Sequence, residues 1–231
     1  MLFAHRGCCR KECAENSLES CIESLRKGFS IEVDVRISED GEAVCIHDAS
    51  LFRTHGSRRS VRHTKASELE RLGVPRLATV LDAVARHPRA RIMLDIKVRP
   101  SSGPLFVAEA LCRKRAISLS RVSAIVWPSP SNFFPPNPPD ILLLGGGGGG
   151  GEATSSRITL HLGLETVPVP KRLSSRVKAV ALPATGQRDI EGIAALQRAS
   201  PSLKINVYCE AAVFNKAFPL LGPKATFTVS F

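Results

Sequence analysis

Two carboxylates, Glu32 and Asp34, lie two residues apart in segment 31–37, which alternates apolar and polar side chains. Residues two apart on a β-strand point to the same side, so both carboxylates project together. On a half-exposed strand such a face is simply solvated. Inside a closed sheet, two like charges need a cation or a basic partner to offset their desolvation and mutual repulsion. The pattern therefore indicates either a solvated strand face or a cation site.

A histidine is expected beside these carboxylates. The dipeptide Asp40-Gly41 is typical of a two-residue hairpin turn, after which residues 43–47 would return as the next strand. In that register, His47 lies directly across from Asp34. The hairpin is thus predicted to place a carboxylate pair and a histidine on one patch.

Segment 91–97 repeats this arrangement, with Asp95 and Lys97 on the side opposite Leu94 and Ile96. Three carboxylates, a lysine and a histidine at strand ends are more typical of a metal and phosphate site than of a network that only stabilises the fold. Hard oxygen ligands with no nearby pair of cysteines favour Mg²⁺ or Ca²⁺ over zinc.

The elements that would position these residues alternate between strands and helices. Such alternation predicts an α/β fold with a largely parallel sheet, and about eight strand candidates favour a closed (β/α)₈ TIM barrel over an open sheet. The expected strands are 1–5, 31–37, 43–47, 91–97, 122–126, 158–162, 177–182 and 203–208. One expected helix begins at Leu18 and has Gly28 as its C-cap, and the others are 77–87, 104–116, 187–199 and 210–221.

Length and composition restrict the class of protein. A chain of 231 residues, 43% hydrophobic and 23% charged, is expected to form one globular domain over residues 1–231. A low-complexity Pro/Gly insert is predicted at 128–156, where seven consecutive glycines, 145–151, precede Glu152 rather than the Lys-Ser/Thr of a phosphate loop. The net charge of +11 indicates contact with something anionic but does not identify it.

Several features bear on compartment and partners. No apolar run approaches the roughly 18 residues of a membrane span, and no signal peptide is recognisable, so we expect an intracellular, cytoplasmic protein. Cys8, Cys9 and Cys13 match no zinc spacing and are expected to be free thiols. The basic segment 53–65 lacks interleaved aromatic side chains. A solvated loop is favoured there over contact with an anionic lipid surface, and nucleic acid is not expected.

Seven short motifs occur in order and resemble those of the glycerophosphodiester phosphodiesterase family. They are Ala4-His-Arg-Gly7, Ala14-Glu-Asn-Ser17, Ile31-Glu-Val-Asp34, Asp40-Gly41, Ile46-His-Asp48, Leu51-Phe-Arg-Thr54 and Leu94-Asp-Ile-Lys97. Each motif alone is weak, but seven in register over residues 2–98 are specific. The resemblance implies a TIM-barrel phosphodiesterase that hydrolyses a glycerophosphodiester to an alcohol and glycerol 3-phosphate with a divalent cation, Mg²⁺ or Ca²⁺.

The same resemblance assigns roles by position. It implies that His5 and His47 form a general acid and base pair, since one group must take a proton from the nucleophile and another must give one to the departing alcohol. It implies that the metal ligands are carboxylates and that two cations hold the phosphate. The expected ligands are Glu32, Asp34 and Asp95, and the expected phosphate-binding residues are Arg6 and Lys97.

The chain also departs from the family pattern. Asp95 stands where the family usually has Glu, and Ala14 replaces a proline. Tyr208-Cys-Glu is the nearest equivalent of the family's Trp-Thr-Val-Asn, and the usual closing motif is scarcely visible in residues 222–231. These departures leave open whether the barrel is incomplete or distorted in its C-terminal third.

Three functions remain open from the sequence. The first is hydrolysis of a small glycerophosphodiester. The second is a lysophospholipase D or sphingomyelinase D type reaction on the same fold, with a lysophospholipid as substrate and peripheral contact with an anionic membrane. The third is a degenerate, non-catalytic barrel that binds phosphorylated ligands.

Overall fold

The computed structural model describes residues 1–10, 12–97, 102–126, 159–163 and 179–230. The predicted insert at 128–156 lies outside these residues. The strands are β1 (Leu2–Ala4), β2 (Ser30–Ile37), β3 (Ala43–Cys45), β4 (Ile92–Ile96), β5 (Val122–Val126), β6 (Thr159–Gly163), β7 (Ala179–Ala184), β8 (Lys204–Glu210) and β9 (Ala225–Ser230). The helices are α1 (Leu18–Arg26), α2 (Phe52–His55), α3 (Ala66–Arg71), α4 (Leu77–Ala85), α5 (Ser102–Lys114), α7 (Gln187–Ala199) and α8 (Ala211–Leu221).

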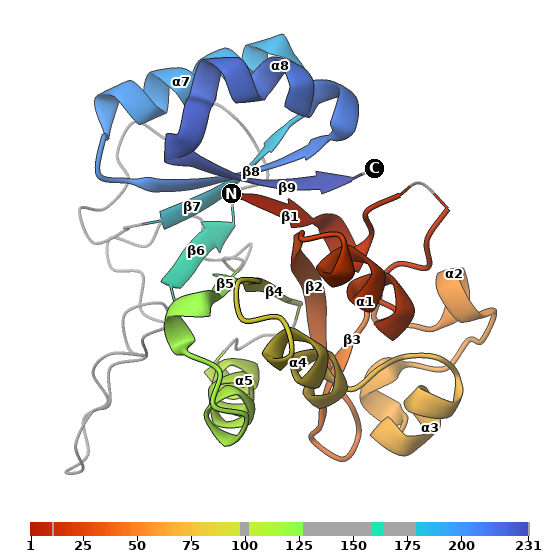
Figure 1. The fold of residues 1–231 in the computed structure, drawn as a ribbon. Coiled ribbons are helices and arrows are strands. Elements are labelled where there is room, and N and C mark those ends of the chain that lie inside the picture. Colours follow the sequence, from red (N-terminus) through yellow and green to blue (C-terminus); the bar gives the residue numbers. More distant parts are fainter. Residues whose placement is uncertain (11, 98–101, 127–158, 164–178, 231) are drawn as a thin grey trace.

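The strands form a ring. Neighbours pair in the order β1-β9-β8-β7-β6-β5-β4-β2, and a further pairing between β2 and β1 returns to the start (Figure 1). Every pairing around this ring is parallel. The predicted α/β barrel is therefore confirmed.

The C-terminal third completes this ring. β9 pairs with β1 on one side, Leu2 facing Phe227, and with β8 on the other, Val207 facing Phe227. In the six residues of β9, Phe227 and Val229 are buried against helices α7 and α8. The alternation Ala-Thr-Phe-Thr-Val-Ser is thus an ordinary strand pattern without the family's usual motif. The C-terminal third is therefore complete, because β9 closes the ring. The predicted strand 43–47 is not part of the ring; it forms β3, which pairs with β2.

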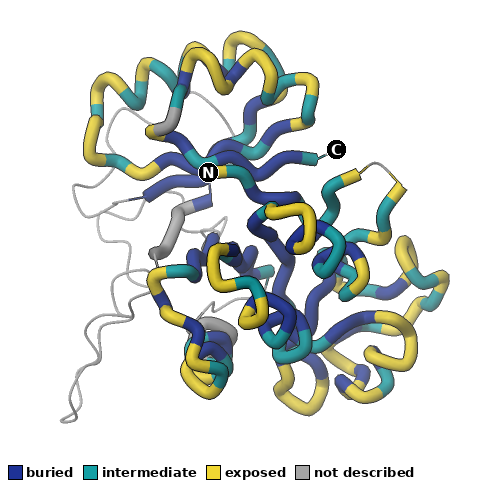
Figure 2. The backbone as a smooth tube through the Cα atoms, in the orientation of Figure 1, coloured by how far each residue is buried: buried dark blue, intermediate teal, exposed yellow. Residues whose placement is uncertain are grey.

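Helices cover the outside of the barrel. α1, α4 and α5 pack on β2, β4 and β5, while α7 and α8 pack on β7, β8 and β9 (Figure 1). The odd residues of β2, such as Val33 and Val35, are buried in this outer layer. The even residues, Glu32 and Asp34, therefore face the barrel interior. Figure 2 shows the strands buried and the outer faces of the helices exposed.

The hairpin between β2 and β3 differs from its predicted register by one residue. Gly41, with φ of 80°, ends a three-residue loop in which Ser38 N donates to Glu42 O at 3.0 Å. A glycine in the left-handed region at the end of a three-residue loop replaces the two-residue turn. Asp34 consequently lies opposite Ile46, whose N donates to Asp34 O at 3.1 Å. The prediction that His47 directly faces Asp34 is wrong by one position.

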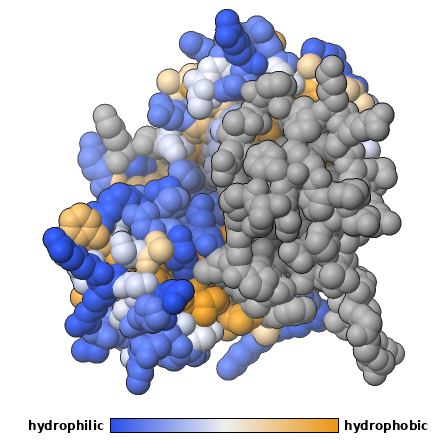
Figure 3. Space-filling view, turned by 180° about the vertical axis from the view of Figure 1, so that it is seen from behind, coloured by the Kyte–Doolittle hydropathy of each residue, from blue (hydrophilic) through white to orange (hydrophobic). Residues whose placement is uncertain are grey.

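No helix in the described part of the chain is both long and apolar enough to span a bilayer. On the face seen in Figure 3, the described surface is mainly hydrophilic, with hydrophobic side chains gathered near its lower middle.

Candidate active site

The ends of three neighbouring strands bring the predicted site residues together. His5 and Arg6 directly follow β1, Asp34 lies within β2, and Asp95 lies near the end of β4. The parallel register places Asp34 directly beside Asp95. Because all ring strands run the same way, these side chains meet at the carboxyl-terminal mouth of the barrel, where barrel enzymes carry their active sites.

The centre of this mouth is a buried acidic cluster of Glu32, Asp34 and Asp95. Their exposed fractions are 0%, 1% and 3%, and one carboxylate oxygen from each lies within 4.8 Å of the others. Burial, and then the charges of Asp34 and Asp95, raise the pKa of Glu32 well above its usual value. Glu32 Oε1 is buried without a hydrogen-bond partner among the described residues. Three hard oxygen donors with an unsatisfied atom have the chemistry to hold a divalent cation.

Two cations from the same strand ends partly neutralise this cluster. Lys97 Nζ lies 2.7 Å from Asp95 Oδ2 and 3.1 Å from Asp34 Oδ1. Arg6 has the left-handed φ of 53°, and its backbone N donates to Glu32 Oε2 at 2.8 Å. Its Nε lies 3.4 Å from Asp34 Oδ2. Burial by itself raises the pKa of Asp34, but Lys97, Arg6 and a hydrogen bond outweigh it and lower that pKa.

That hydrogen bond comes from Asn16, which the sequence analysis did not assign to the site. Asn16 Nδ2 donates to Asp34 Oδ2 at 2.8 Å, and Asp34 N donates to Asn16 Oδ1 at 3.0 Å. Asn tolerates the left-handed φ of 57° found here. The adjacent Ser17 caps α1, accepting from Ser20 N at 3.1 Å. The motif Ala14-Glu-Asn-Ser17 contains Asn16, but an Asn at this position also suits a helix cap, so its contact with Asp34 was not predicted.

His5 lies at one edge of the cluster. Its Nε2 is 4.0 Å from Glu32 Oε2, and its Nδ1 is 2.6 Å from Ser230 Oγ on β9. Burial, and then the nearby Arg6 guanidinium, lower the pKa of His5 to about 4. The imidazole is therefore neutral near pH 7 and can accept a proton.

His47 lies on the loop after β3, close enough to Asp34 to be the smallest of the causes that lower the pKa of that carboxylate. Its Nδ1 is 2.6 Å from Asp48 Oδ1. Its backbone O accepts from Arg36 Nε at 2.8 Å, while Arg36 Nη1 donates to Lys97 O at 3.3 Å. Arg36 thus ties the His47 loop to the end of β4.

An ion-pair chain links the two histidine loops. Arg53 Nη2 lies 2.5 Å from Glu15 Oε1, and Arg53 Nε lies 2.7 Å from Asp48 Oδ2. Glu15 Oε2 in turn lies 2.9 Å from Arg6 Nη1. Hydrogen bonds from Arg53 and then His47 lower the pKa of Asp48 to about 2. Sequence reasoning treated the basic segment as a solvated loop, so it missed Arg53, although the motif Leu51-Phe-Arg-Thr54 contains it.

The cysteines that precede Glu15 and Asn16 in the chain differ from their predicted state. Cys8 and Cys13 form a disulfide across a Cα separation of 5.8 Å, and Cys9 is free. That separation lies in the usual range for a disulfide. The expectation of three free thiols is therefore wrong for Cys8 and Cys13.

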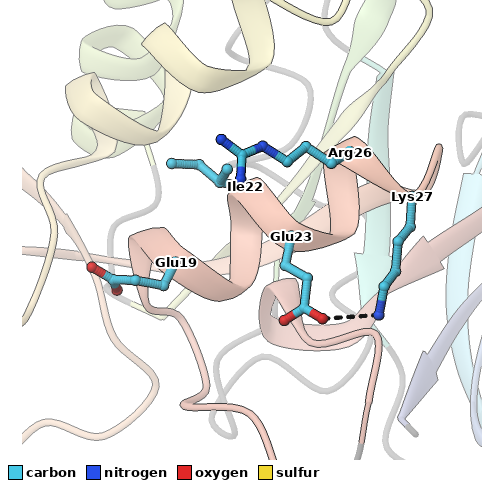
Figure 4. A pocket seen from close by; sticks show the side chains of 5 residues that line it. All are labelled: Glu19, Ile22, Glu23, Arg26 and Lys27. Carbon is cyan, nitrogen blue, oxygen red and sulfur yellow. Dashed lines mark hydrogen bonds and ion pairs between the residues drawn. The ribbon is translucent and has the colours of Figure 1, made fainter.

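A surface hollow beside α1 does not share this chemistry. It is lined by Glu19, Ile22, Glu23, Arg26 and Lys27, which belong to α1 and its C-cap (Figure 4). Lys27 Nζ donates to Glu23 Oε1 at 2.8 Å, so part of the hollow's charge is paired. A hollow lined by one helix has no groups converging from different elements, which a catalytic site needs.

Comparisons with known proteins agree with the geometry. Residues 5–114 match the glycerophosphoryl diester phosphodiesterase family. A glycerophosphodiester phosphodiesterase of Bacillus altitudinis is 30% identical over 114 residues, which cover 43% of this chain and 45% of that protein. The aligned part therefore spans less than half the length of this relative.

Solved structures resemble the barrel over nearly its whole length. A phosphodiesterase of Oleispira antarctica in complex with the product sn-glycerol-3-phosphate has a TM-score of 0.72 at 15% identity, covering 99% of this chain and 92% of that one. A glycerophosphodiester phosphodiesterase of Agrobacterium tumefaciens has a TM-score of 0.67 at 22% identity, covering 99% and 95%. At these identities the likeness establishes the fold.

Proposed function

On the premise that residues 5–114 belong to the glycerophosphoryl diester phosphodiesterase family, we propose that this chain is a metal-dependent phosphodiesterase. It hydrolyses a glycerophosphodiester to an alcohol and glycerol 3-phosphate. The observation that carries this proposal is the buried cluster of Glu32, Asp34 and Asp95, with His5 and Lys97 against it at the mouth of the barrel.

Glu32, Asp34 and Asp95 would hold the divalent cation, Mg²⁺ or Ca²⁺. When bound, this ion neutralises charge on the phosphate oxygens as the reaction proceeds. The fit rests on three buried oxygen donors and the unpartnered Glu32 Oε1. Asp95 has a shorter side chain than the Glu usual in the family, which keeps the charge but changes the reach of that ligand.

His5 and His47 would transfer the protons. One imidazole takes the proton of the attacking nucleophile, which is water or a neighbouring hydroxyl of the substrate, and the other protonates the departing alcohol oxygen. Each ring has its Nδ1 held, by Ser230 in one case and by Asp48 in the other. The Nε2 atoms are therefore the ones left to exchange protons with the substrate.

Arg6 and Lys97 would bind the phosphate. In support of this role, both side chains contact carboxylates of the cluster, so two cations lie beside it. Cations positioned there stabilise the charge that grows on the phosphoryl oxygens in the transition state.

A lysophospholipid is the second candidate substrate. Phe52 is 60% exposed on α2, and the basic segment 53–65 follows it directly. An exposed aromatic side chain beside several cations suits peripheral contact with an anionic lipid surface. The same catalytic residues would then release the headgroup from a lipid.

The test is release of glycerol 3-phosphate from glycerophosphocholine, with Mg²⁺ or Ca²⁺ and with a chelator. Lysophosphatidylcholine is assayed in parallel to separate the two substrate classes. We expect His5→Ala and His47→Ala to abolish turnover. The matched control is His87→Ala, because His87 lies after α4 and its ring Nδ1 lies 2.9 Å from the backbone O of Ala83. A folded wild-type protein that turns over neither substrate would favour the non-catalytic barrel.

A further inference from the structure

Tyr208 lies inside the barrel beside the site but has no role in the mechanism described so far. It is a residue of β8 and pairs in register with Thr228 of β9. Its side chain packs against an interior layer formed by one residue from each of four strands: Phe3, Met93, Ile125 and Ala181. The Tyr208 ring therefore packs against the interior residues that lie below the carboxyl-terminal mouth.

The Tyr208 ring lies next to a proposed proton-transfer group. Its centroid is 5.9 Å from that of the His5 ring, with the two planes at 79°, which is an edge-to-face contact. The Tyr208 side chain therefore lies at the same mouth of the barrel as His5.

The hydroxyl is buried and unsatisfied. Tyr208 Oη has no hydrogen-bond partner among the described residues, although three carboxylates are close enough to affect it electrostatically. A buried polar group normally has a partner, so an unpaired one requires an explanation. Leaving it unpaired costs stability, which a structural role alone would not favour.

Two other buried side-chain atoms share this condition in the described part of the chain, and both lie in the same mouth. They are Glu32 Oε1 and Arg6 Nε, and the latter makes no hydrogen bond although it lies 3.4 Å from Asp34 Oδ2. Arg6 Nε–H and a phenol hydroxyl are both donors, so together they fit an acceptor with several lone pairs. Glu32 Oε1 is an acceptor and fits a cation. A phosphate oxyanion would accept from the two donors, and a cation held by the cluster would satisfy Glu32 Oε1.

We propose that Tyr208 is a substrate-binding residue whose hydroxyl donates a hydrogen bond to an anionic phosphate oxygen. This inference rests on the proposed function, because it takes the phosphodiester to bind at the carboxylate cluster. The ligand chemistry is a phosphate monoester or diester, and inorganic phosphate and glycerol 3-phosphate are its simplest probes.

The test uses Tyr208→Phe, which removes the hydroxyl and keeps the ring that packs on Phe3 and Met93. Glycerol 3-phosphate binding is measured by calorimetry in Mg²⁺, and inorganic phosphate is measured in the same way. Hydrogen bonds to charged groups are strong, so we expect roughly tenfold weaker binding of both anions and a similar fall in kcat/KM. We also expect an equal or higher melting temperature without ligand, because an unpaired buried hydroxyl is removed.

The matched control is Thr226→Val on the neighbouring strand. Thr226 Oγ1 donates to Asn206 Oδ1 at 2.9 Å, so its hydroxyl is satisfied within the protein. Removing it should lower the melting temperature and leave anion binding unchanged, the opposite pattern to Tyr208→Phe.

The outcomes separate this inference from the proposed function. Wild-type turnover together with unchanged anion binding by Tyr208→Phe would overturn the role of Tyr208 and leave the reaction standing. If the wild type binds the anions without turning over substrate, and Tyr208→Phe binds them more weakly, the proposed reaction is overturned and Tyr208 is supported as an anion-binding residue. A melting temperature lowered in Tyr208→Phe with binding intact would mean that the hydroxyl is structural.

Discussion

Asp48 and His47 are adjacent in the chain and joined through their side chains, with Asp48 Oδ1 2.6 Å from His47 Nδ1. The other oxygen of Asp48 lies 2.7 Å from Arg53 Nε, and Arg53 also pairs with Glu15. Arg53 thus fixes the position of the Asp48 carboxylate, and the carboxylate in turn orients the His47 imidazole. This arrangement fixes which ring nitrogen of His47 faces the site.

Replacing Asp48 with Asn should impair catalysis more than folding. Asn keeps the shape of Asp but loses the charge that pairs with His47 and Arg53. We expect kcat to fall roughly 10- to 100-fold, the range typical for partners that orient a site histidine. Stability should change by no more than about 1 kcal/mol, because these ion pairs are partly exposed. Steady-state kinetics and thermal unfolding measure the two effects.

A matched control for this variant is Asp82→Asn. Asp82 Oδ1 also pairs with an arginine, Arg115 Nε at 2.7 Å, but it lies on α4 outside the barrel. Equal losses of kcat in both variants would mean that Asp48 has no special relation to His47.

Acid stability should also depend on Asp48. Hydrogen bonds from Arg53 and His47 lower its pKa to about 2, below the value of about 3.9 for an unfolded Asp. A lowered folded pKa adds stability above the unfolded value, and this stability is lost as the pH falls towards the folded value. The difference in unfolding free energy between wild type and Asp48→Asn should therefore be largest above about pH 5 and should decrease below about pH 4. Urea unfolding across this range measures it, and a difference that grows with acidification would contradict the assignment.

The acidic cluster makes a prediction about metal affinity. Asp95→Asn removes one of three buried carboxylates, and affinity for hard cations depends on the number of charged ligands. We expect Mg²⁺ binding to weaken by roughly tenfold or more, which calorimetry can measure on the folded variant. Asp82→Asn again serves as the control. Unchanged Mg²⁺ affinity in Asp95→Asn would remove Asp95 from the ligand set.

Much of this cluster is predictable from sequence because it depends on local periodicity. The alternation in segment 31–37 places Glu32 and Asp34 on one face, and the repeat in 91–97 adds Asp95 and Lys97. The register of the β2–β3 hairpin was missed by one residue, because Asp40-Gly41 suits both a two-residue and a three-residue loop. Local patterns do not decide between them.

The outer residues of the site depend on contacts between distant segments. Arg53 meets Glu15 across 38 positions, and Ser230 meets His5 across 225. No periodicity relates such residues, so a motif can mark them without revealing what they touch. The unpartnered hydroxyl of Tyr208 is likewise a property of the packed interior rather than of its strand.

Thiol reactivity tests the pairing in the His5 loop. Cys21, Cys45, Cys112 and Cys209 are buried, and Cys8 and Cys13 are bonded to each other, which leaves Cys9 as the half-buried free thiol. Alkylation of the native, unreduced protein should therefore modify one cysteine, Cys9, as read by peptide mass spectrometry. Modification of Cys8 and Cys13 without prior reduction would contradict the disulfide.

The most direct test of the central claim is turnover of glycerophosphocholine by the full chain after metal removal and re-addition. If the buried carboxylates hold a catalytic cation, glycerol 3-phosphate release should stop in chelator and return with Mg²⁺ or Ca²⁺ in the wild type. In Glu32→Gln, which removes one charge from the cluster, the added ion should restore little activity. Release that continues undiminished in chelator, or that is unaffected by Glu32→Gln, would contradict a metal-dependent phosphodiesterase at this site.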